Sequence, residues 1–324
     1  MTTGQQPREK IVAVVGPTAS GKSSVAVEMA KRVKGEIVYA DSVAVYRGLD
    51  IGSAKPTETE RDGVPHHLID VAEPVERYDA ARYAREAQDA VAGIIGRGRV
   101  PIVAGGTGLY LKSLIYGLVP APQADREIRS ALRKRLKTDG AERLHDELAA
   151  VDPDSARKIK PQDGVRIVRA LEIYHATGRP AGEIRKRHGF SEHRYDVLYL
   201  GLLMERELLY HLIDERVDQM IRGGIVEEVR ALLEGWAGGA GGCTHESHAL
   251  GAIGYKEICG YLRGETDLDE TISLVKRNTR RLAKRQMTWF RGIPDIRWFA
   301  HPYPTDEMAD TIERFMGKAA GGAG

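Results

Sequence analysis

A glycine-rich stretch near the start of the chain has the spacing of a phosphate-binding loop. Residues 16–23 read GPTASGKS and fit the pattern G-x4-G-K-[ST]. They follow an apolar, β-branched run from Ile11 to Val15, which predicts a buried strand, and they lead into a helix predicted from Ser20 to about Val33. Glycines let the backbone wrap a phosphate, and the first turn of a helix offers free N–H donors. The pattern therefore predicts a phosphate or diphosphate site, but it does not establish ATP hydrolysis.

Two side chains of this loop, and one acid outside it, have the chemistry to act on a bound phosphate ester. Lys22 supplies a full positive charge, and the Ser23 hydroxyl can bind Mg²⁺. A P-loop nucleotide hydrolase places an Asp after a neighbouring strand to hold this metal. Here the predicted strand 101–104 ends in Gly-Gly-Thr, and the acid, Asp41, follows another predicted strand, 37–40. Asp41 could take a proton from a nucleophile, or it could only cap a turn.

The elements that must position these residues alternate between strand and helix. Asp79 has the character of an N-cap and precedes a helical spacing of apolar residues that runs to Ile95. Alternation of this kind predicts an α/β fold, a P-loop NTPase-like parallel sheet with helices on both faces. Ligands of such sheets bind beyond the carboxyl ends of the strands. Gly16, Asp41 and Gly105 all fall at those ends, so we expect them to line one crevice.

The character of the chain changes near Pro120. From there to about Tyr195 it is helical in pattern, rich in Arg and Lys, and poor in strand signals, and a strand-like run at 197–203 then resumes the α/β style. We predict a core of residues 1–117 and 196–324, with C-terminal helices, interrupted by a helical insertion domain of residues 118–195. After the insertion, an apolar helix stripe ends at Gly223-Gly224, and we interpret it as core rather than as a ligand-binding surface: Leu208, Leu209, Leu212, Ile213, Val217, Met220 and Ile221.

The composition is that of an ordinary soluble enzyme, with 42% hydrophobic and 29% charged residues. No apolar run approaches the roughly 20 residues that span a bilayer, and the first ten residues lack the apolar part of a secretion signal. We expect a cytoplasmic protein without a membrane partner. Two cysteines without a CxxC motif also favour a reducing compartment. Cys243, His245 and His248 could ligate zinc, but they follow GWAGGAGG, and a polar loop is the preferred interpretation.

A basic run stands out against a net charge of only +2. Between Lys276 and Arg291 there are seven basic residues and no acidic one. Such a run can bind phosphates on a nearly neutral protein, or it can be a solvated helix face. From the run alone, the solvated helix face is the preferred interpretation.

Long segments of the chain resemble the bacterial tRNA dimethylallyltransferases over almost its full length. The matching segments are GPTASGKS, ADSVAVYRGLDIGSAKP, HHLIDV, AGGTGLYLKSL, RALEIYHATGRP, AIGYKE and AKRQMTWFR. The resemblance implies transfer of a five-carbon dimethylallyl group from dimethylallyl diphosphate to the exocyclic amine of the adenosine 3′ of the anticodon. Such an enzyme releases diphosphate and does not use ATP.

The resemblance also assigns roles to individual residues. Asp41 would be the general base on the adenine amine, and Thr107 would lie near the reacting atoms. Arg216 would contact the diphosphate, although a surface ion pair is the alternative. The cofactor would be Mg²⁺, with Ser23 as a ligand. The diphosphate of the donor would bind to Gly16, Thr18, Ala19, Ser20, Gly21, Lys22, Ser23 and Arg216.

The expected partner is the anticodon stem-loop of tRNA, bound by a monomer. Trp289 and Phe290 could stack on a base or pack in the core, and packing is the preferred interpretation for Phe290. The residues that match tRNA-contacting segments of the family are Asp41, Ser42, Val43, Ala44, Thr107, Arg129, Val165, Arg166, Ile167, Val168, Arg169, Ala252, Ile253, Gly254, Tyr255, Lys256, Lys284, Arg285, Gln286, Met287, Thr288, Trp289, Phe290 and Arg291.

Two positions depart from the family pattern. The family carries Asp-Ser-Met-Gln where this chain has Asp41-Ser42-Val43-Ala44, so one polar contact to the nucleic acid is in doubt. It also carries Arg where this chain has Gly251, which removes a cation from a predicted RNA-facing loop. Neither change touches the diphosphate site, so we expect activity with an altered tRNA preference.

Three other functions fit parts of the sequence. A small-molecule P-loop kinase would leave the basic insertion and the basic run unexplained. An adenylate prenyltransferase, acting on free nucleotides, would share the donor site but have less use for tRNA-binding segments. A tRNA-binding protein with an inactive P-loop is disfavoured because Lys22, Ser23 and Asp41 are all present.

Overall fold

The computed structural model describes residues 8–118, 126–188, 193–235, 243–244 and 247–317. The chain divides into two compact units: residues 1–115 with 194–324, and residues 116–193. Each limit lies two residues from the one predicted. The role of the second unit in tRNA binding stays a prediction.

The first unit is built on a six-stranded sheet in the order β3-β2-β4-β1-β5-β6. Every strand pair is parallel, as the alternation of strands and helices predicts. The strands are β1 (Glu9–Val15), β2 (Gly35–Tyr39), β3 (His66–His67), β4 (Val100–Gly105), β5 (Tyr195–Leu203) and β6 (Arg297–Ala300). The strands β1, β2 and β4 are buried along almost their whole length, which is typical of a parallel sheet covered on both faces.

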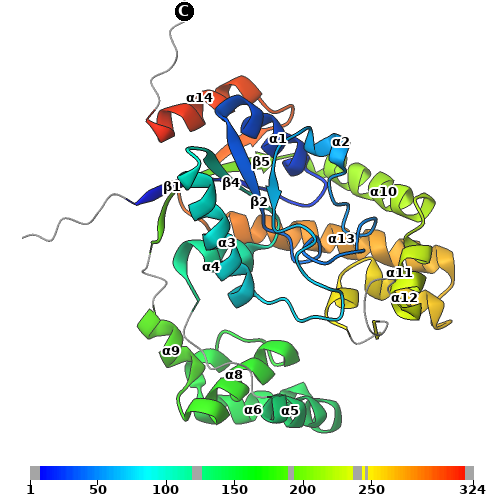
Figure 1. Ribbon diagram of the computed structural model, residues 1–324. Helices are drawn as coiled ribbons and strands as arrows, with labels where there is room; N and C mark the ends of the chain where they lie inside the picture. The colour runs from blue at the N-terminus through cyan, green and yellow to red at the C-terminus, as the bar shows by residue number, and fades with distance from the viewer. Residues whose placement is uncertain (1–7, 119–125, 189–192, 236–242, 245–246, 318–324) are drawn as a thin grey trace, which may run out of the picture. The chain divides into compact units, whose positions relative to one another are not determined.

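Helices cover both faces of this sheet (Figure 1). On one face, α1 (Lys22–Val33) and α14 (Thr305–Met316) pack with alternate strand residues in one apolar cluster. On the other, α3 (Ala80–Gly96) contacts β2 and β4, and α4 (Gly108–Tyr116) follows β4. The predicted cap is present, because Asp79 Oδ1 accepts from the amides of Ala81 (3.0 Å) and Arg82 (3.1 Å). The α1 helix begins at Lys22 rather than at Ser20, since Ala19 and Gly21 have positive φ angles of 63° and 75° and extend the loop.

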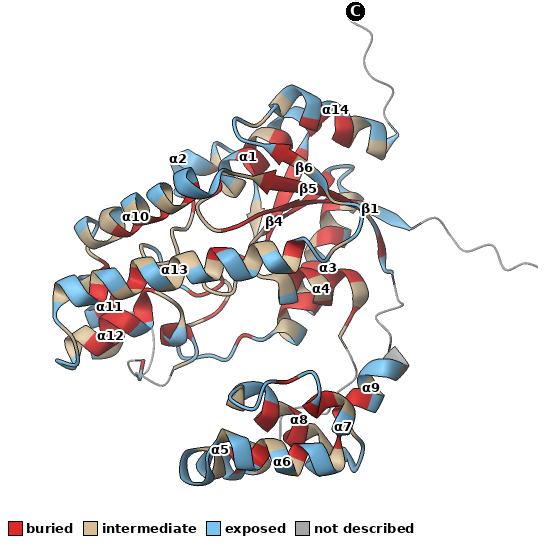
Figure 2. Cartoon of the chain, turned by 180° about the vertical axis from the view of Figure 1, so that it is seen from behind, coloured by how far each residue is buried: buried red, intermediate tan, exposed pale blue. Residues whose placement is uncertain are grey.

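The remaining helices of this unit follow β5, apart from a short one. They are α10 (Arg206–Arg222), α11 (Ile225–Glu234), the 3-10 turn η1 (Ala249–Gly251), α12 (Tyr255–Leu262) and α13 (Leu268–Phe290). The short helix α2 (Glu58–Arg61) follows β2. The long helix α13 packs against both α10 and α12. Figure 2 shows an alternation of buried and exposed residues along α13, which is that of a helix with one face against the protein and one in solvent.

The second unit is entirely helical in its described part, as predicted for the insertion. It consists of α5 (Arg126–Asp139), α6 (Ala141–Val151), α7 (Pro153–Ala156), α8 (Gly164–Thr177) and α9 (Ala181–His188). It has its own apolar core, which includes Leu132, Leu144, Leu148, Ile167 and Leu171. The buried carboxylate of Asp152 caps α7 through the amide of Ser155 (3.0 Å) and also accepts from the amide of Gly182 at the start of α9 (2.8 Å).

Within the described part of the chain, no helix is both long enough and apolar enough to cross a bilayer.

Candidate active site

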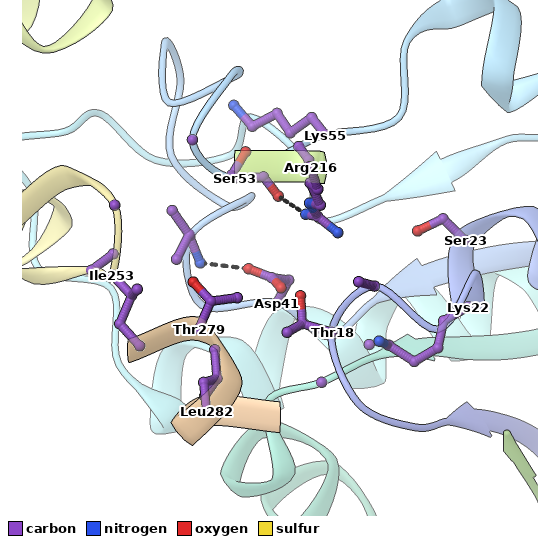
Figure 3. Close-up of a pocket in the computed structure, with 18 of the residues that line it drawn as sticks. Thr18, Lys22, Ser23, Asp41, Ser53, Lys55, Arg216, Ile253, Thr279 and Leu282 are labelled. Carbon is purple, nitrogen blue, oxygen red and sulfur yellow. Dashed lines mark hydrogen bonds between the residues drawn. The ribbon is translucent and has the colours of Figure 1, made fainter. Parts of the chain in front are cut away.

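A cavity of about 570 Å³ opens at the carboxyl ends of β1, β2 and β4. Its walls come from the P-loop, the loop after β2, the turn after β4, α10, the segment 251–254 and α13 (Figure 3). Lys22, Asp41 and Gly105 all line it, so the three sequence motifs do meet in one crevice. All of these residues belong to the first unit.

The P-loop presents a cation whose charge is sensitive to its surroundings. Lys22 Nζ donates to the carbonyl of Pro17 at 2.6 Å. Burial, and secondarily the nearby Arg216 charge, lower the pKa of Lys22 to about 7, although Asp41 acts in the opposite direction. The protein therefore holds Lys22 in a site that disfavours its charge, and an anion bound there would restore it.

The Ser23 hydroxyl, the predicted metal ligand, is paired with the phenol of Tyr39 at 2.7 Å. Burial raises the pKa of Tyr39 to about 12, so the phenol stays protonated at neutral pH. The described residues contain no group of three or more His, Cys, Asp or Glu side chains that could hold a metal alone. Magnesium is typically bound by one or two protein oxygens together with substrate phosphates. Ser23 fits that mode, with the diphosphate supplying the other oxygens.

Arg216 brings a second cation to the cavity from α10. Its Nη2 donates to the carbonyl of Ser53 at 3.2 Å, as Figure 3 shows. Burial lowers the pKa of its guanidinium from the ordinary value. No ion pair of Arg216 with a described carboxylate is present, so the predicted alternative, a surface ion pair, is not what the structure has. The remaining guanidinium donors are available for an anion.

Asp41 has the capping role that was one of the two left open by the sequence. Its Oδ1 accepts from the amides of Val43 (2.8 Å) and Ala44 (3.2 Å), which is a capping arrangement. Its Oδ2 accepts no hydrogen bond from any described residue, and Asp41 lines the cavity. One oxygen fixes the loop, the other has no described partner, and the role of Asp41 as a base stays a prediction.

Thr107 supports this loop rather than lining the cavity. Its Oγ1 accepts from the amide of Ser42 at 3.0 Å and lies 3.3 Å from the Ser42 hydroxyl, and its own amide donates to the carbonyl of Ala40 at 3.1 Å. The predicted place of Thr107 beside the reacting atoms stays a prediction. In the structure, Thr107 links the turn after β4 to the Asp41 loop.

Some of the predicted tRNA-contacting residues of the first unit line the cavity, and others are buried. Ser42, Val43, Ala252, Ile253, Gly254 and Gln286 line the cavity. Ala44, Tyr255 and Phe290 are buried, and the Tyr255 hydroxyl donates to Glu228 at 2.6 Å. Packing is therefore the role of Phe290, as expected. The same interpretation applies to Tyr255, although the family resemblance did not predict its burial.

The basic run divides between paired and unpaired residues. Lys276 contacts Asp218 at 2.7 Å, and Arg280 contacts Asp214 through its Nε at 3.0 Å, so both serve the α10–α13 interface. The other five are exposed and have no ion pair with any described residue: Arg277, Arg281, Lys284, Arg285 and Arg291. The interpretation as a solvated face fails for the paired residues. Four of the exposed residues form a basic face of α13 without a described ion-pair partner, and the fifth, Arg291, directly follows the helix.

The second unit contains the rest of the predicted tRNA-contacting residues. Arg129 donates to the buried carboxylate of Glu172 through Nε (3.1 Å) and Nη2 (2.8 Å) and so joins α5 to α8. Ile167 and Val168 lie in the core of this unit. Val165 is 81% exposed, Arg166 is exposed beside its partner Asp163, and Arg169 is half-buried beside its partner Glu172. These last three offer the accessible surface that a nucleic acid could contact.

The cavity also has an apolar wall that the sequence did not predict. Ile213, Val217 and Met220 of α10 line the cavity together with Ile253, Val275 and Leu282. The interpretation of the α10 stripe as core is confirmed for Leu209, Ile213 and Val217, which are buried, although the last two also line the cavity. Leu208 is 36% exposed. A 3.6-residue period reports that a face is covered, but it cannot tell protein from ligand. Ser53, Lys55 and Thr279, which also line the cavity, carried no motif beyond the family resemblance.

The predicted loop after Gly235 is described only in part. Cys243 is buried, and His248 Nδ1 lies 3.1 Å from the Tyr46 hydroxyl. His245 lies outside the described residues. The partner of His248 is thus a phenol, which leaves the zinc interpretation without support.

The parallel sheet, with its P-loop after β1 and its cavity at the carboxyl edge, defines an α/β protein of the phosphate-binding P-loop class. Comparison with known proteins narrows this class. Residues 44–293 match the family model described as IPP transferase. The chain is 49% identical to the tRNA dimethylallyltransferase of Geobacter metallireducens over 311 residues, 96% of this chain and 99% of that protein. The chain therefore belongs to the IPP transferase family.

Comparison with solved structures supports the same family. The full-length tRNA isopentenylpyrophosphate transferase of Bacillus halodurans is 40% identical, with a TM-score of 0.68 and 96% of each chain covered. A eukaryotic dimethylallyltransferase studied while acting on tRNA is 28% identical, with a TM-score of 0.78, and the match covers 97% of this chain and 81% of that one.

Proposed function

We propose that this chain is a tRNA dimethylallyltransferase, which moves a dimethylallyl group from dimethylallyl diphosphate to the exocyclic amine of the adenosine 3′ of the anticodon. The observation that carries the proposal is the composition of one cavity. A P-loop cation, a second cation on α10, and a carboxylate with an uncommitted oxygen all open into it beside an apolar wall.

The cationic side of the cavity suits the leaving group. As the allylic C–O bond breaks, negative charge collects on the diphosphate, and Lys22 and Arg216 neutralise it together with P-loop amides. A Mg²⁺ ion bound to Ser23 and the diphosphate would add further charge neutralisation there. The carbon left behind is an allylic cation, which is stabilised by delocalisation, so loss of diphosphate needs no covalent help from the protein.

Asp41 and the apolar wall suit the acceptor. The exocyclic amine of adenine is a weak nucleophile, so holding it in line with the allylic carbon matters more than activating it. The new C–N bond forms as the amine attacks, and the surplus proton passes to Asp41 Oδ2. The apolar wall keeps water from competing for the allylic carbon.

Access to this cavity requires the target base to leave its stack. The exposed cations of α13 would hold the surrounding phosphates while the base enters, since phosphate contacts fix orientation without reading sequence. Val165, Arg166 and Arg169 of the second unit are further candidates for contact with the stem-loop.

Mass spectrometry of tRNA nucleosides tests the proposal. tRNA from cells that carry the gene should contain an adenosine enlarged by one dimethylallyl group, or a further modified form of it, and tRNA from cells without the gene should lack it. The gene carrying Lys22→Ala should not restore the nucleoside. Identical nucleoside profiles with and without the gene would rule the proposal out.

A further inference from the structure

Gln286 connects the basic helix α13 to the P-loop. Its carboxamide faces into the protein, where Oε1 accepts from the amide of Thr18 at 2.8 Å and Nε2 donates to the carbonyl of Gly106 at 3.0 Å. One side chain thus uses both ends to join the P-loop to the turn after β4. Gln286 also lines the cavity.

The turn after β4 is shaped to receive α13. A Cβ atom on Gly106 would lie 2.2 Å from Gln286 Nε2, and one on Gly108 would lie 2.5 Å from the Trp289 ring. Neither glycine has a positive φ angle, so glycine is required at both positions by the close approach of the helix. The helix α13 and this turn are therefore in close contact. A shift of α13 would displace Gln286 and with it the hydrogen bond to the Thr18 amide.

The same helix presents its charge to solvent. Lys284 and Arg285 are exposed, and they precede Gln286 directly in the sequence. Because α13 is one unbroken helix of 23 residues, it connects the cations on its outer face directly to Gln286, which contacts the P-loop.

We propose that Gln286 is a positioning residue through which RNA bound to the outer face of α13 raises the affinity of the P-loop for the prenyl donor. This inference rests on the proposed function. RNA bound to α13 fixes the position of the helix. Gln286 then fixes the Thr18 amide, so the donor binds to a P-loop that is already ordered. A ligand that removes an ordering cost for a second ligand produces positive coupling between them.

The test measures binding, in an enzyme already shown to transfer the group. Donor affinity is determined with and without a saturating anticodon stem-loop whose target adenosine is replaced by purine riboside, which has no exocyclic amine and cannot react. In the wild type the stem-loop should tighten binding of dimethylallyl diphosphate at least ~5-fold, and by linkage the donor should tighten binding of the stem-loop by the same factor. In Gln286→Met, which keeps the length and removes both hydrogen bonds, the factor should fall below ~2-fold.

Two further variants separate this role from a structural one. Gln286→Glu keeps an acceptor for Thr18 and removes the donor to Gly106, so intermediate coupling is expected. Arg285→Met should weaken binding of the stem-loop while donor affinity without RNA stays at the wild-type value. Unfolding temperatures of all variants show whether they are folded. Coupling in folded Gln286→Met equal to that of the wild type, or no coupling in an active wild type, would overturn the inference. An enzyme that transfers nothing would instead overturn the proposed function.

Discussion

At the scale of single residues, Asp41 is the side chain for which we propose both a structural and a chemical role. Its Oδ1 accepts from two backbone amides, and its Oδ2 is left without a described partner in the cavity. Because the loop needs only a neutral acceptor at Oδ1, the two roles can be separated by substitution.

Asp41→Asn should leave folding intact and stop the proton transfer. The Asn carbonyl can accept from Val43 and Ala44 as the Asp does, but the amide cannot accept the amine proton. We expect the single-turnover rate, with donor and tRNA saturating, to fall by roughly 10²- to 10⁴-fold, the usual contribution of a positioned base. The unfolding temperature should stay close to that of the wild type. A rate within a few-fold of the wild type would mean that positioning and leaving-group stabilisation suffice.

Lys22 makes donor binding depend on pH. In the ligand-free protein the pKa of Lys22 is about 7 instead of 10.5. Between these values the unfolded chain binds a proton that the native protein lacks, so the contribution of Lys22 to stability increases as pH rises through this window. The affinity for the donor should change with pH in the opposite direction. The diphosphate favours the charged lysine, so binding of the donor must be accompanied by uptake of a proton.

Calorimetry at pH 8, in two buffers that differ in ionisation enthalpy, measures this proton uptake. The wild type should take up close to ~1 proton per donor bound, and donor affinity should fall as pH rises above 7. Lys22→Met should bind the donor weakly and with much less uptake. If the wild type binds the donor without taking up protons, Lys22 is already charged in the free enzyme.

At the scale of elements, α13 has two faces with different tasks. Lys276 and Arg280 pair with carboxylates of α10, whereas Arg281 and Arg285 are exposed without a described partner. The sequence showed the run of charge, but not which charges are neutralised, because Asp214 and Asp218 lie about 60 residues away and approach only through the packing of α10 on α13.

Substitutions on the two faces should therefore have different effects. Arg281→Ala with Arg285→Ala should weaken tRNA binding, and the slope of log affinity against log salt should decrease by roughly 0.7 to 0.9 for each phosphate that is no longer neutralised. Lys276→Ala with Arg280→Ala is the matched pair, and it should mainly lower the unfolding temperature. Equal salt slopes for the wild type and the Arg281/Arg285 variant would return this face to a solvated role.

How far the sequence could predict the site depended on the distance between partners along the chain. The P-loop, Asp41 and the parallel strands are local patterns, and the structure has them as expected. The hydrogen bonds of Thr107 with Ser42, of Gln286 with Thr18 and of Tyr255 with Glu228 join distant segments. A periodic stripe or a polar residue does not identify such a partner. For the same reason, the apolar stripe of α10 did not show that some of its residues also line the cavity.

At the scale of the whole molecule, the helical unit is an insertion whose ends meet. The amide of Arg194 donates to the carbonyl of Ile115 at 3.0 Å, so the chain leaves and re-enters the first unit at one place. Each unit has its own apolar core. We therefore expect the first unit to fold without the second.

Replacing residues 117–193 by a short glycine linker should give a folded protein that binds dimethylallyl diphosphate as the full chain does, because all residues lining the cavity belong to the first unit. Its affinity for the anticodon stem-loop should fall at least ~10-fold if the second unit supplies phosphate contacts. Titration of both ligands checks this. Full stem-loop affinity in the shortened protein would contradict the predicted tRNA-binding role of the insertion.

A competition between acceptors tests the proposed reaction in a single experiment on the purified protein. Dimethylallyl diphosphate, Mg²⁺, an anticodon stem-loop and free adenosine monophosphate are incubated together without ATP, and each acceptor is analysed by mass spectrometry. We expect one dimethylallyl group on the stem-loop, none on the free nucleotide, and one diphosphate released per transfer. Transfer to adenosine monophosphate alone would identify an adenylate prenyltransferase. A parallel incubation with ATP added that yields a phosphorylated product and no prenyl transfer would identify a kinase. Either result would contradict the proposed reaction.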